Sequence, residues 1–199
     1  MARTADPHRR EIILRAATDV LIEQGYSEMR LADIAKRAGV AISTLYLYFD
    51  SKEEMVRAIA DQISAELNDL LQPVFESLTN LADIERLIEL AASYTDKRRD
   101  QIRVLVLDNG LRGVHTRHIR VQPDVRIQRI MQTVRKRGAA GSLHPYDPLF
   151  LVEMVVGFVF WFVTVYIVLD ESEIDVFKAF CVQWLYNALI PPKESAPSL

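Results

Sequence analysis

Apolar residues throughout this 199-residue chain repeat with the three- and four-residue spacing that gathers side chains on one face of an α-helix. The spacing predicts helices over about residues 8–24, where Gly25 offers a stop, over residues 31–38, where Gly39 follows, and over residues 42–48. The two-residue alternation of a half-buried strand is sustained nowhere. The fold is therefore predicted to be all-α.

The start and the end of a long fourth helix are also marked. The run Ser51-Lys52-Glu53-Glu54 has the pattern of a capping box, with Ser51 as the N-cap and Glu54 reaching back. The helix is expected to end before Pro73.

Charge is distributed unevenly along the chain. The formal net charge is −3, yet residues 97–137 carry +9, whereas residues 61–96 carry −7 and residues 138–199 carry −5. Two interpretations of this basic block stay open. Its arginines either attract an anionic effector with an apolar tail or pair with the acidic helices. The arginines in question are Arg98, Arg99, Arg103 and Arg112.

Cysteine and histidine residues offer little chemistry. The single cysteine, Cys181, cannot form an intramolecular disulfide, and no secretory signal pattern opens the sequence, so we expect a cytoplasmic protein. His115 and His118 have the spacing of one helix face, but no further ligand set stands out nearby. We predict no metal and no cofactor.

The segment Leu149–Leu169 is long and apolar enough to resemble a membrane span, with Glu153 as its only charge. Its flanks argue against a span, because Asp147 precedes it and Asp170 follows it, whereas an anchor normally carries Lys or Arg on one side. A helix that is apolar all round is otherwise buried by the core and by a partner subunit. We therefore predict an oligomer and no membrane.

Residues 31–48 have the pattern of a helix-turn-helix. Two helices that cross closely need a small residue at the crossing, a Gly where the backbone turns with positive φ, and aliphatic residues that fix the angle. Ala35 is the small residue and Gly39 is the turn. The aliphatic positions are Ile34, Ala38, Val40 and Leu45.

The runs Asp33–Val40 and Thr44–Glu53 resemble the DNA-binding signature of TetR-type bacterial transcriptional regulators. The resemblance covers about residues 8–60. It implies a homodimeric DNA-binding regulator, usually a repressor, whose C-terminal domain binds an effector and dimerises through its last two helices. The expected division is a helix-turn-helix domain at residues 1–52, an effector-binding and dimerisation domain at residues 53–190, and a flexible tail at residues 191–199.

The resemblance also implies which residues contact double-stranded operator DNA. Ile42 stands where a polar residue is common, and its methyl groups can pack against a thymine methyl. Ala41 replaces the usual capping Ser, and Arg30 adds a charge that can reach a phosphate. The predicted DNA-binding residues are Arg30, Ile42, Ser43, Thr44, Tyr46, Tyr48 and Lys52.

The C-terminal domain offers aromatic residues that can line an apolar cavity between helices, although such residues also build cores. The effector is predicted to be small and largely apolar, with an anionic group as an open alternative. The predicted effector-binding residues are Tyr94, Arg103, Arg112, Phe158, Trp161, Phe162 and Tyr166.

A second stripe, on the last helix, suits a four-helix dimer interface. The sequence does not decide which face of residues 149–169 meets the partner. The predicted interface residues are Gly157, Phe177, Cys181, Trp184 and Ala188.

We therefore predict a ligand-responsive repressor that a small molecule releases from a palindromic operator. A ligand carrier and an enzyme are the alternative classes. No Gly-rich phosphate loop, Ser elbow or His-Glu zinc motif supports an enzyme.

Overall fold

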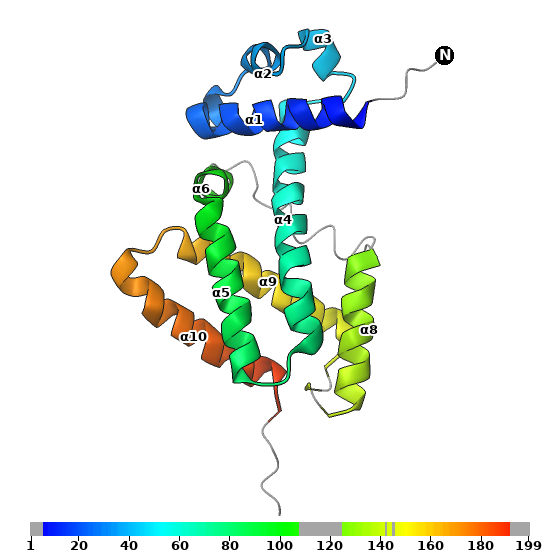
Figure 1. Ribbon diagram of the computed structural model, residues 1–199, viewed down its shortest axis with the longest axis vertical. Coiled ribbons are helices and arrows are strands. Elements are labelled where there is room, and N and C mark those ends of the chain that lie inside the picture. The colour runs from blue at the N-terminus through cyan, green and yellow to red at the C-terminus, as the bar shows by residue number, and fades with distance from the viewer. Residues whose placement is uncertain (1–5, 108–124, 142, 145, 192–199) are drawn as a thin grey trace, which may run out of the picture. The chain divides into compact units, whose positions relative to one another are not determined.

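The computed structural model describes residues 6–107, 125–141, 143–144 and 146–191, and these residues form helices and turns without strands (Figure 1). The prediction of an all-α fold is confirmed. Arg112, His115 and His118 lie outside the described residues. The helices are α1 (Pro7–Glu28), α2 (Leu31–Ala38), α3 (Ile42–Leu45), α4 (Lys52–Ser77), α5 (Leu81–Lys97), α6 (Arg99–Leu107), α8 (Val125–Ala139), α9 (Pro148–Tyr166) and α10 (Glu171–Leu189).

Contacts divide the chain into two compact units. The first comprises residues 1–66 and 98–114, and the second comprises residues 67–97 and 115–199. The first unit includes the beginning of α4 and also α6, which packs against α1. The boundary expected at residues 52 and 53 assigns α6 and nearly all of α4 to the effector domain, and this division by function stays a prediction. A boundary inside a helix carries no turn residue, so the sequence does not mark it.

The first unit has a hydrophobic core that joins α1 to the helix-turn-helix. Ile13, Ala17 and Leu21 form the buried face of α1, as the periodicity predicts. Ile34 from α2 and Leu45 from α3 are fully buried in the same cluster. These contacts hold α2 and α3 at a fixed angle to each other.

Two helix ends in the first unit differ from the sequence prediction. Gly25 interrupts α1 with a φ of 75°, as expected of a stop, but one more helical turn follows it as far as Glu28. α3 ends at Leu45, and the chain continues to Tyr48 as a turn closed by hydrogen bonds from the Leu47 and Tyr48 amides to carbonyls three residues back.

The start of α4 is capped nearly as predicted. Ser51 Oγ accepts a hydrogen bond from the Glu54 amide at 3.1 Å. The Glu54 carboxylate reaches one residue further than in a capping box and accepts from the Asp50 amide at 2.5 Å. This pair of contacts fixes the turn between α3 and α4.

The prediction that the fourth helix ends before Pro73 is wrong, because α4 continues to Ser77. A proline inside a helix removes one backbone hydrogen bond. Here the residues after it are held by burial, since Val74 and Phe75 are buried and Leu78 is fully buried. Tertiary packing thus outweighs the local preference.

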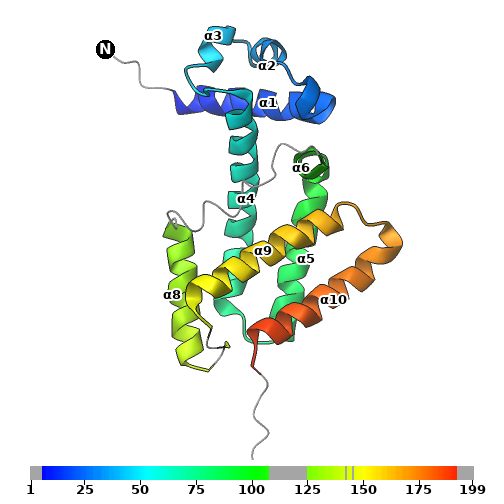
Figure 2. The ribbon, with the colours of Figure 1, turned by 180° about the vertical axis from the view of Figure 1, so that it is seen from behind.

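The second unit is a layer of helices in which α9 and α10 both pack against α5 and α8 packs against α9 (Figure 2). Lys178 of α10 forms an ion pair with Glu89 of α5 at 2.5 Å. Among the described residues, α9 is the one helix long and apolar enough to cross a membrane by length and composition, a test that a core helix also passes. Asp147 caps α9 by accepting from the Leu149 and Phe150 amides.

Candidate nucleic-acid interface and effector cavity

The turn between α2 and α3 has the geometry that a helix-turn-helix requires. Gly39 adopts a left-handed conformation with a φ of 66°, and its amide and the Val40 amide donate to the carbonyls of Lys36 and Ala35. Ala35, at the crossing, is buried. These observations support the sequence interpretation of residues 31–48.

The segment from Ile42 to Phe49 has a buried side and an exposed side. Leu45 and Phe49 are buried in the core of the first unit. Ile42 is 45% exposed, Tyr46 is 53% exposed and Leu47 is 74% exposed. The exposed side chains of this short segment are thus free to enter a major groove, which is wide enough to admit a helix.

The remaining predicted DNA-binding residues surround this segment. Arg30 and Ser43 are exposed, whereas Thr44 and Tyr48 are half-buried. The Tyr48 hydroxyl accepts a hydrogen bond from the Asp6 amide at 3.3 Å, which ties the start of α1 to the segment from Ile42 to Phe49, called the recognition segment below. Ala41 provides no side-chain cap to α3, as expected from the missing Ser.

Lys52, a predicted phosphate contact, is engaged within the protein. Its ammonium group donates to the Tyr26 carbonyl at 2.8 Å and lies 4.3 Å from the centre of the Tyr26 ring. The Tyr26 hydroxyl donates to the Glu53 carboxylate at 2.7 Å. This hydrogen bond raises the pKa of Tyr26 to about 12 and lowers the pKa of Glu53. Tyr26 therefore joins the last turn of α1 to the first turn of α4.

An ion pair holds α2 against α1. Both guanidinium nitrogens of Arg37 donate to the Glu23 carboxylate, at 2.8 Å and 2.6 Å. The hydrogen bonds from Arg37 lower the pKa of Glu23. Neither Tyr26 nor Arg37 was predicted as a site residue, because their partners lie far away in the sequence.

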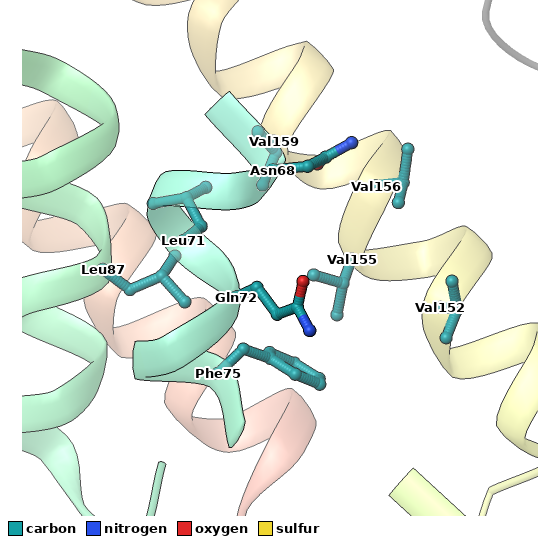
Figure 3. Close-up of a pocket in the computed structure, with 9 residues that line it drawn as sticks. All are labelled: Asn68, Leu71, Gln72, Phe75, Leu87, Val152, Val155, Val156 and Val159. Carbon is teal, nitrogen blue, oxygen red and sulfur yellow. The ribbon is translucent and has the colours of Figure 1, made fainter. Parts of the chain in front are cut away.

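The second unit contains a narrow apolar cavity of about 40 Å³. Figure 3 shows residues of α4, α5 and α9 around it, with the carboxamides of Asn68 and Gln72 on the α4 side. None of the residues that line it is charged. The lining residues are Asn68, Leu71, Gln72, Phe75, Leu87, Val152, Val155, Val156 and Val159.

None of the predicted effector-binding residues that the structure describes lines this cavity. Phe158 instead stacks on Trp184 at 4.8 Å between ring centres, and Phe162 stacks on Phe177 at 5.3 Å. The Tyr166 hydroxyl donates to Asp96 at 2.9 Å. Phe158 and Phe162 thus join α9 to α10, and Tyr166 joins α9 to α5. Tyr94 is half-buried and Arg103 is exposed.

A different pattern on α9 marks the cavity. Val152, Val155, Val156 and Val159 follow the three- and four-residue spacing of one helix face, and all four line the cavity. Valine is not a preferred helix residue, so four valines at this spacing are the sequence signal that could have identified the cavity.

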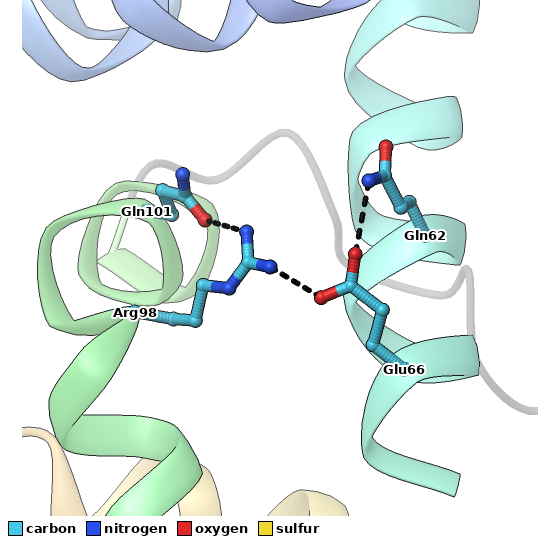
Figure 4. A network of polar contacts seen from close by, with 4 residues as sticks. All are labelled: Gln62, Glu66, Arg98 and Gln101. Atoms are coloured by element: carbon cyan, nitrogen blue, oxygen red, sulfur yellow. Dashed lines mark hydrogen bonds and ion pairs between the residues drawn. The ribbon is translucent and has the colours of Figure 1, made fainter. Parts of the chain in front are cut away.

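Two arginines of the basic block form hydrogen bonds inside their own unit. Arg98 donates to Glu66 of α4 at 2.5 Å and to Gln101 at 3.1 Å, and Gln62 donates to the same Glu66 carboxylate (Figure 4). In the second unit, Arg137 donates to the Phe75 carbonyl near the end of α4 at 3.3 Å. The ion pair between Arg98 and Glu66 agrees with the pairing interpretation, whereas Arg137 donates to a backbone carbonyl rather than to a carboxylate.

The predicted interface residues divide into exposed and buried ones. Gly157 is exposed and Trp184 is 41% exposed, whereas Phe177 and Ala188 are half-buried. Cys181 is fully buried in the chain itself, and burial raises the pKa of its thiol to about 12. A side chain without exposed surface cannot touch a partner, so Cys181 is removed from the expected contact set.

Further apolar side chains of α9 and α10 are exposed beside Gly157 and Trp184. Phe160 is 44% exposed and Phe180 is 56% exposed.

Among the described residues, no group of His, Cys, Asp or Glu is arranged to hold a metal ion.

Comparison with known proteins gives the same assignment for the N-terminal helices. Residues 13–59 match the family model described as bacterial regulatory proteins, tetR family. The chain is 40% identical over 62 residues to the uncharacterized HTH-type transcriptional regulator YvdT of Bacillus subtilis, a match that covers 31% of this chain and 32% of that relative.

Solved structures resemble the chain over most of its length. A putative TetR-family transcriptional regulator from Mesorhizobium loti has a TM-score of 0.64 at 16% identity, covering 95% of this chain and 100% of the other. The transcriptional regulator FadR of Bacillus subtilis, solved with stearoyl-CoA, has a TM-score of 0.61 at 19% identity, covering 89% and 98%. At these identities the likeness concerns the fold. Residues 13–59 thus carry a helix-turn-helix of the tetR type, and the described part of the chain has the fold of these solved structures.

Proposed function

We propose that this DNA-binding regulator is a homodimeric repressor that a small, largely apolar and uncharged molecule releases from a palindromic operator. The observation that carries the proposal is the position of the cavity on α4. Asn68, Leu71, Gln72 and Phe75 line the cavity, while the earlier residues of the same helix belong to the unit that contains the helix-turn-helix.

The size of the cavity supports a link between ligand binding and α4. A volume of about 40 Å³ holds little more than a water molecule, so an effector must separate α4 from the valine face of α9. A ligand that binds only the separated arrangement shifts the population toward it. Because α4 is one continuous helix, its displacement at residues 68–75 is transmitted along the helix axis toward residue 52.

The chemistry of the lining supports an uncharged effector. Burying an unpaired carboxylate in an apolar cavity is costly, and no described lining residue offers a cation. The carboxamides of Asn68 and Gln72 can instead pair with a hydroxyl or carbonyl group. The alternative of an anionic effector depends on Arg103 and Arg112, and the stearoyl-CoA of FadR is a ligand of that protein.

The exposed aromatic residues of α9 and α10 support the homodimer. A soluble monomer rarely exposes a large contiguous apolar patch, and two helices from each chain can bury such a patch as a four-helix bundle. A two-fold dimer presents two α3 segments, so its operator has two related half-sites one or more helical turns apart, about 10 bp each. The exposed residues are Phe160, Trp161, Val176, Phe180 and Trp184.

The site of action follows from the proposed function. A protein that reads promoter DNA in a bacterium works in the cytoplasm, where its single cysteine stays reduced. This agrees with Cys181 being a free, buried thiol.

The test is release of labelled DNA from the purified protein by matched ligand pairs. DNA from upstream of its gene is bound first. Neutral long-chain alcohols and esters are then compared with the corresponding acids, and release by the neutral members is expected. Val155→Phe fills the cavity and should abolish release without weakening DNA binding, whereas Val168→Phe, at an exposed position, should not.

The results also separate the alternative classes of function. Equal release of DNA from the wild type and from the Val155→Phe protein would contradict the cavity as the effector site. A protein that binds these ligands but never binds DNA selectively would be a carrier, and turnover of a ligand would indicate an enzyme.

A further inference from the structure

The recognition segment lacks the side chains that most often read bases. Arg and Lys bind guanine with paired hydrogen bonds, Asn and Gln bind adenine, and Asp and Glu accept from cytosine. None of these six residue types occurs between Val40 and Phe49. All ten residues from Val40 to Phe49, which include the recognition segment, lie in the described part of the chain.

The outermost side chain of the segment is apolar. Successive residues in a helix or a tight helical turn are about 100° to 120° apart, so Leu47, two residues beyond the buried Leu45, points away from the core. Its exposed fraction of 74% agrees with this direction. Ile42, at the start of α3, adds a second exposed aliphatic side chain. Figure 1 shows α3 at the edge of the helix-turn-helix, with no other helix of that unit outside it.

The polar residues of the segment discriminate poorly between bases. Ser43, Thr44 and the exposed Tyr46 carry hydroxyl groups, which donate and accept and therefore suit several base edges. Tyr48 already accepts a hydrogen bond from the Asp6 amide. Base discrimination from this segment is thus left to apolar contact, and the apolar group that a major groove presents is the C5-methyl of thymine.

We propose that Leu47 and Ile42 determine operator specificity by packing against thymine C5-methyl groups, so that each half-site is read at thymines. This rests on the proposed binding of operator DNA and specifies how that binding becomes selective. Each methyl group buried against Leu47 or Ile42 contributes about a fourfold gain in affinity.

The experiment removes only the methyl groups. Duplexes are selected from a random library with the purified wild-type protein, and the selected duplex is then synthesised with deoxyuridine in place of one thymine at a time. Deoxyuridine pairs as thymine does but lacks the C5-methyl. Affinity is expected to fall about fourfold at the contacted thymines and to stay unchanged elsewhere.

Variants of the protein show which side chain contacts each thymine methyl group. The Leu47→Ala protein should bind duplexes with thymine and with deoxyuridine equally tightly at the positions that Leu47 contacts. At the positions that Ile42 contacts, the loss of affinity on replacing thymine by deoxyuridine, called the penalty below, should remain. Leu47→Met keeps an apolar side chain of similar size and should keep the penalty, as should Ser43→Ala. Because Leu47 is exposed, these substitutions leave the fold intact, and circular dichroism confirms that.

The outcomes that overturn the proposal are distinct. If every deoxyuridine-substituted duplex binds as tightly as the thymine duplex, the protein does not recognise methyl groups. This result overturns the proposal but is compatible with operator binding. A thymine preference that persists unchanged in both Leu47→Ala and Ile42→Ala overturns the assignment to these residues. A selection that enriches no sequence overturns both this proposal and selective operator binding.

Discussion

Gly157 offers a direct measure of whether a second copy covers α9. It lies in the middle of the helix and is exposed, and apart from its chain neighbours and the backbone of its own helix no described atom lies within 4 Å of the position that a Cβ would occupy. A helix interior prefers Leu or Ala over Gly by about 0.8–1.0 kcal/mol. Within a single chain, Gly157→Leu should therefore stabilise the fold and raise Tm by about 2–4 °C.

The opposite effect of Gly157→Leu is expected if α9 lies in a dimer interface. If a partner helix packs over Gly157, a leucine forces the helices apart, and overpacking costs about 1–3 kcal/mol at each site. A two-fold interface contains the residue twice, so the dimer loses about 2–6 kcal/mol. The dissociation constant should then rise at least about 30-fold, since 1.4 kcal/mol corresponds to a factor of ten.

Sedimentation equilibrium and thermal unfolding at several protein concentrations measure both effects. Glu85→Leu is the matched control, because it adds a leucine at an exposed position of α5. We expect Gly157→Leu to dissociate and Glu85→Leu to remain dimeric. A Gly157→Leu protein that dimerises as tightly as the wild type and unfolds at a higher temperature would refute the proposed interface.

Four further substitutions and treatments have defined outcomes. Leu45→Ala removes a fully buried side chain and should cost about 2–5 kcal/mol of stability together with operator binding, as measured by denaturant unfolding and fluorescence anisotropy. Lys52→Ala should weaken binding to all DNA sequences and reduce the slope of the logarithm of the binding constant against the logarithm of salt concentration by about one. An unchanged slope would contradict the role of Lys52 as a phosphate contact. Because the pKa of Tyr26 is raised from 10.0 to about 12, the folded protein holds that proton more tightly than the unfolded chain. The stability that Tyr26 adds is thus present below pH 10 and lost as pH rises to about 12, and Tyr26→Phe should remove this part of the alkaline decline. Cys181, whose pKa burial raises to about 12, should react with thiol reagents only after unfolding; fast reaction of the native protein would contradict its burial.

The helix-turn-helix is the part of the molecule that the sequence specifies best. Its signals are local, since Gly39 sets the turn, Ala35 allows the close crossing and Leu45 completes the core. The end of α4 was missed because distant packing around Val74 and Phe75 outweighs the proline before them.

The cavity was harder to predict because α9 is apolar on every side. Periodicity identifies a buried face only by contrast with a polar face, and α9 offers no such contrast. Aromatic residues were therefore expected at the cavity, whereas Val155 and its neighbours line it and Phe158 stacks on Trp184. The contact between Tyr26 and Lys52 joins the ends of two helices and depends on the tertiary fold.

Footprinting on the DNA upstream of its gene reports operator binding, operator symmetry and release by a ligand in one measurement. We predict one protected stretch that contains two inverted half-sites about 10 bp apart or a multiple of that spacing, and loss of protection when a neutral cavity ligand is added. Protection no stronger than on unrelated DNA, or a single half-site without a two-fold partner, would contradict this prediction.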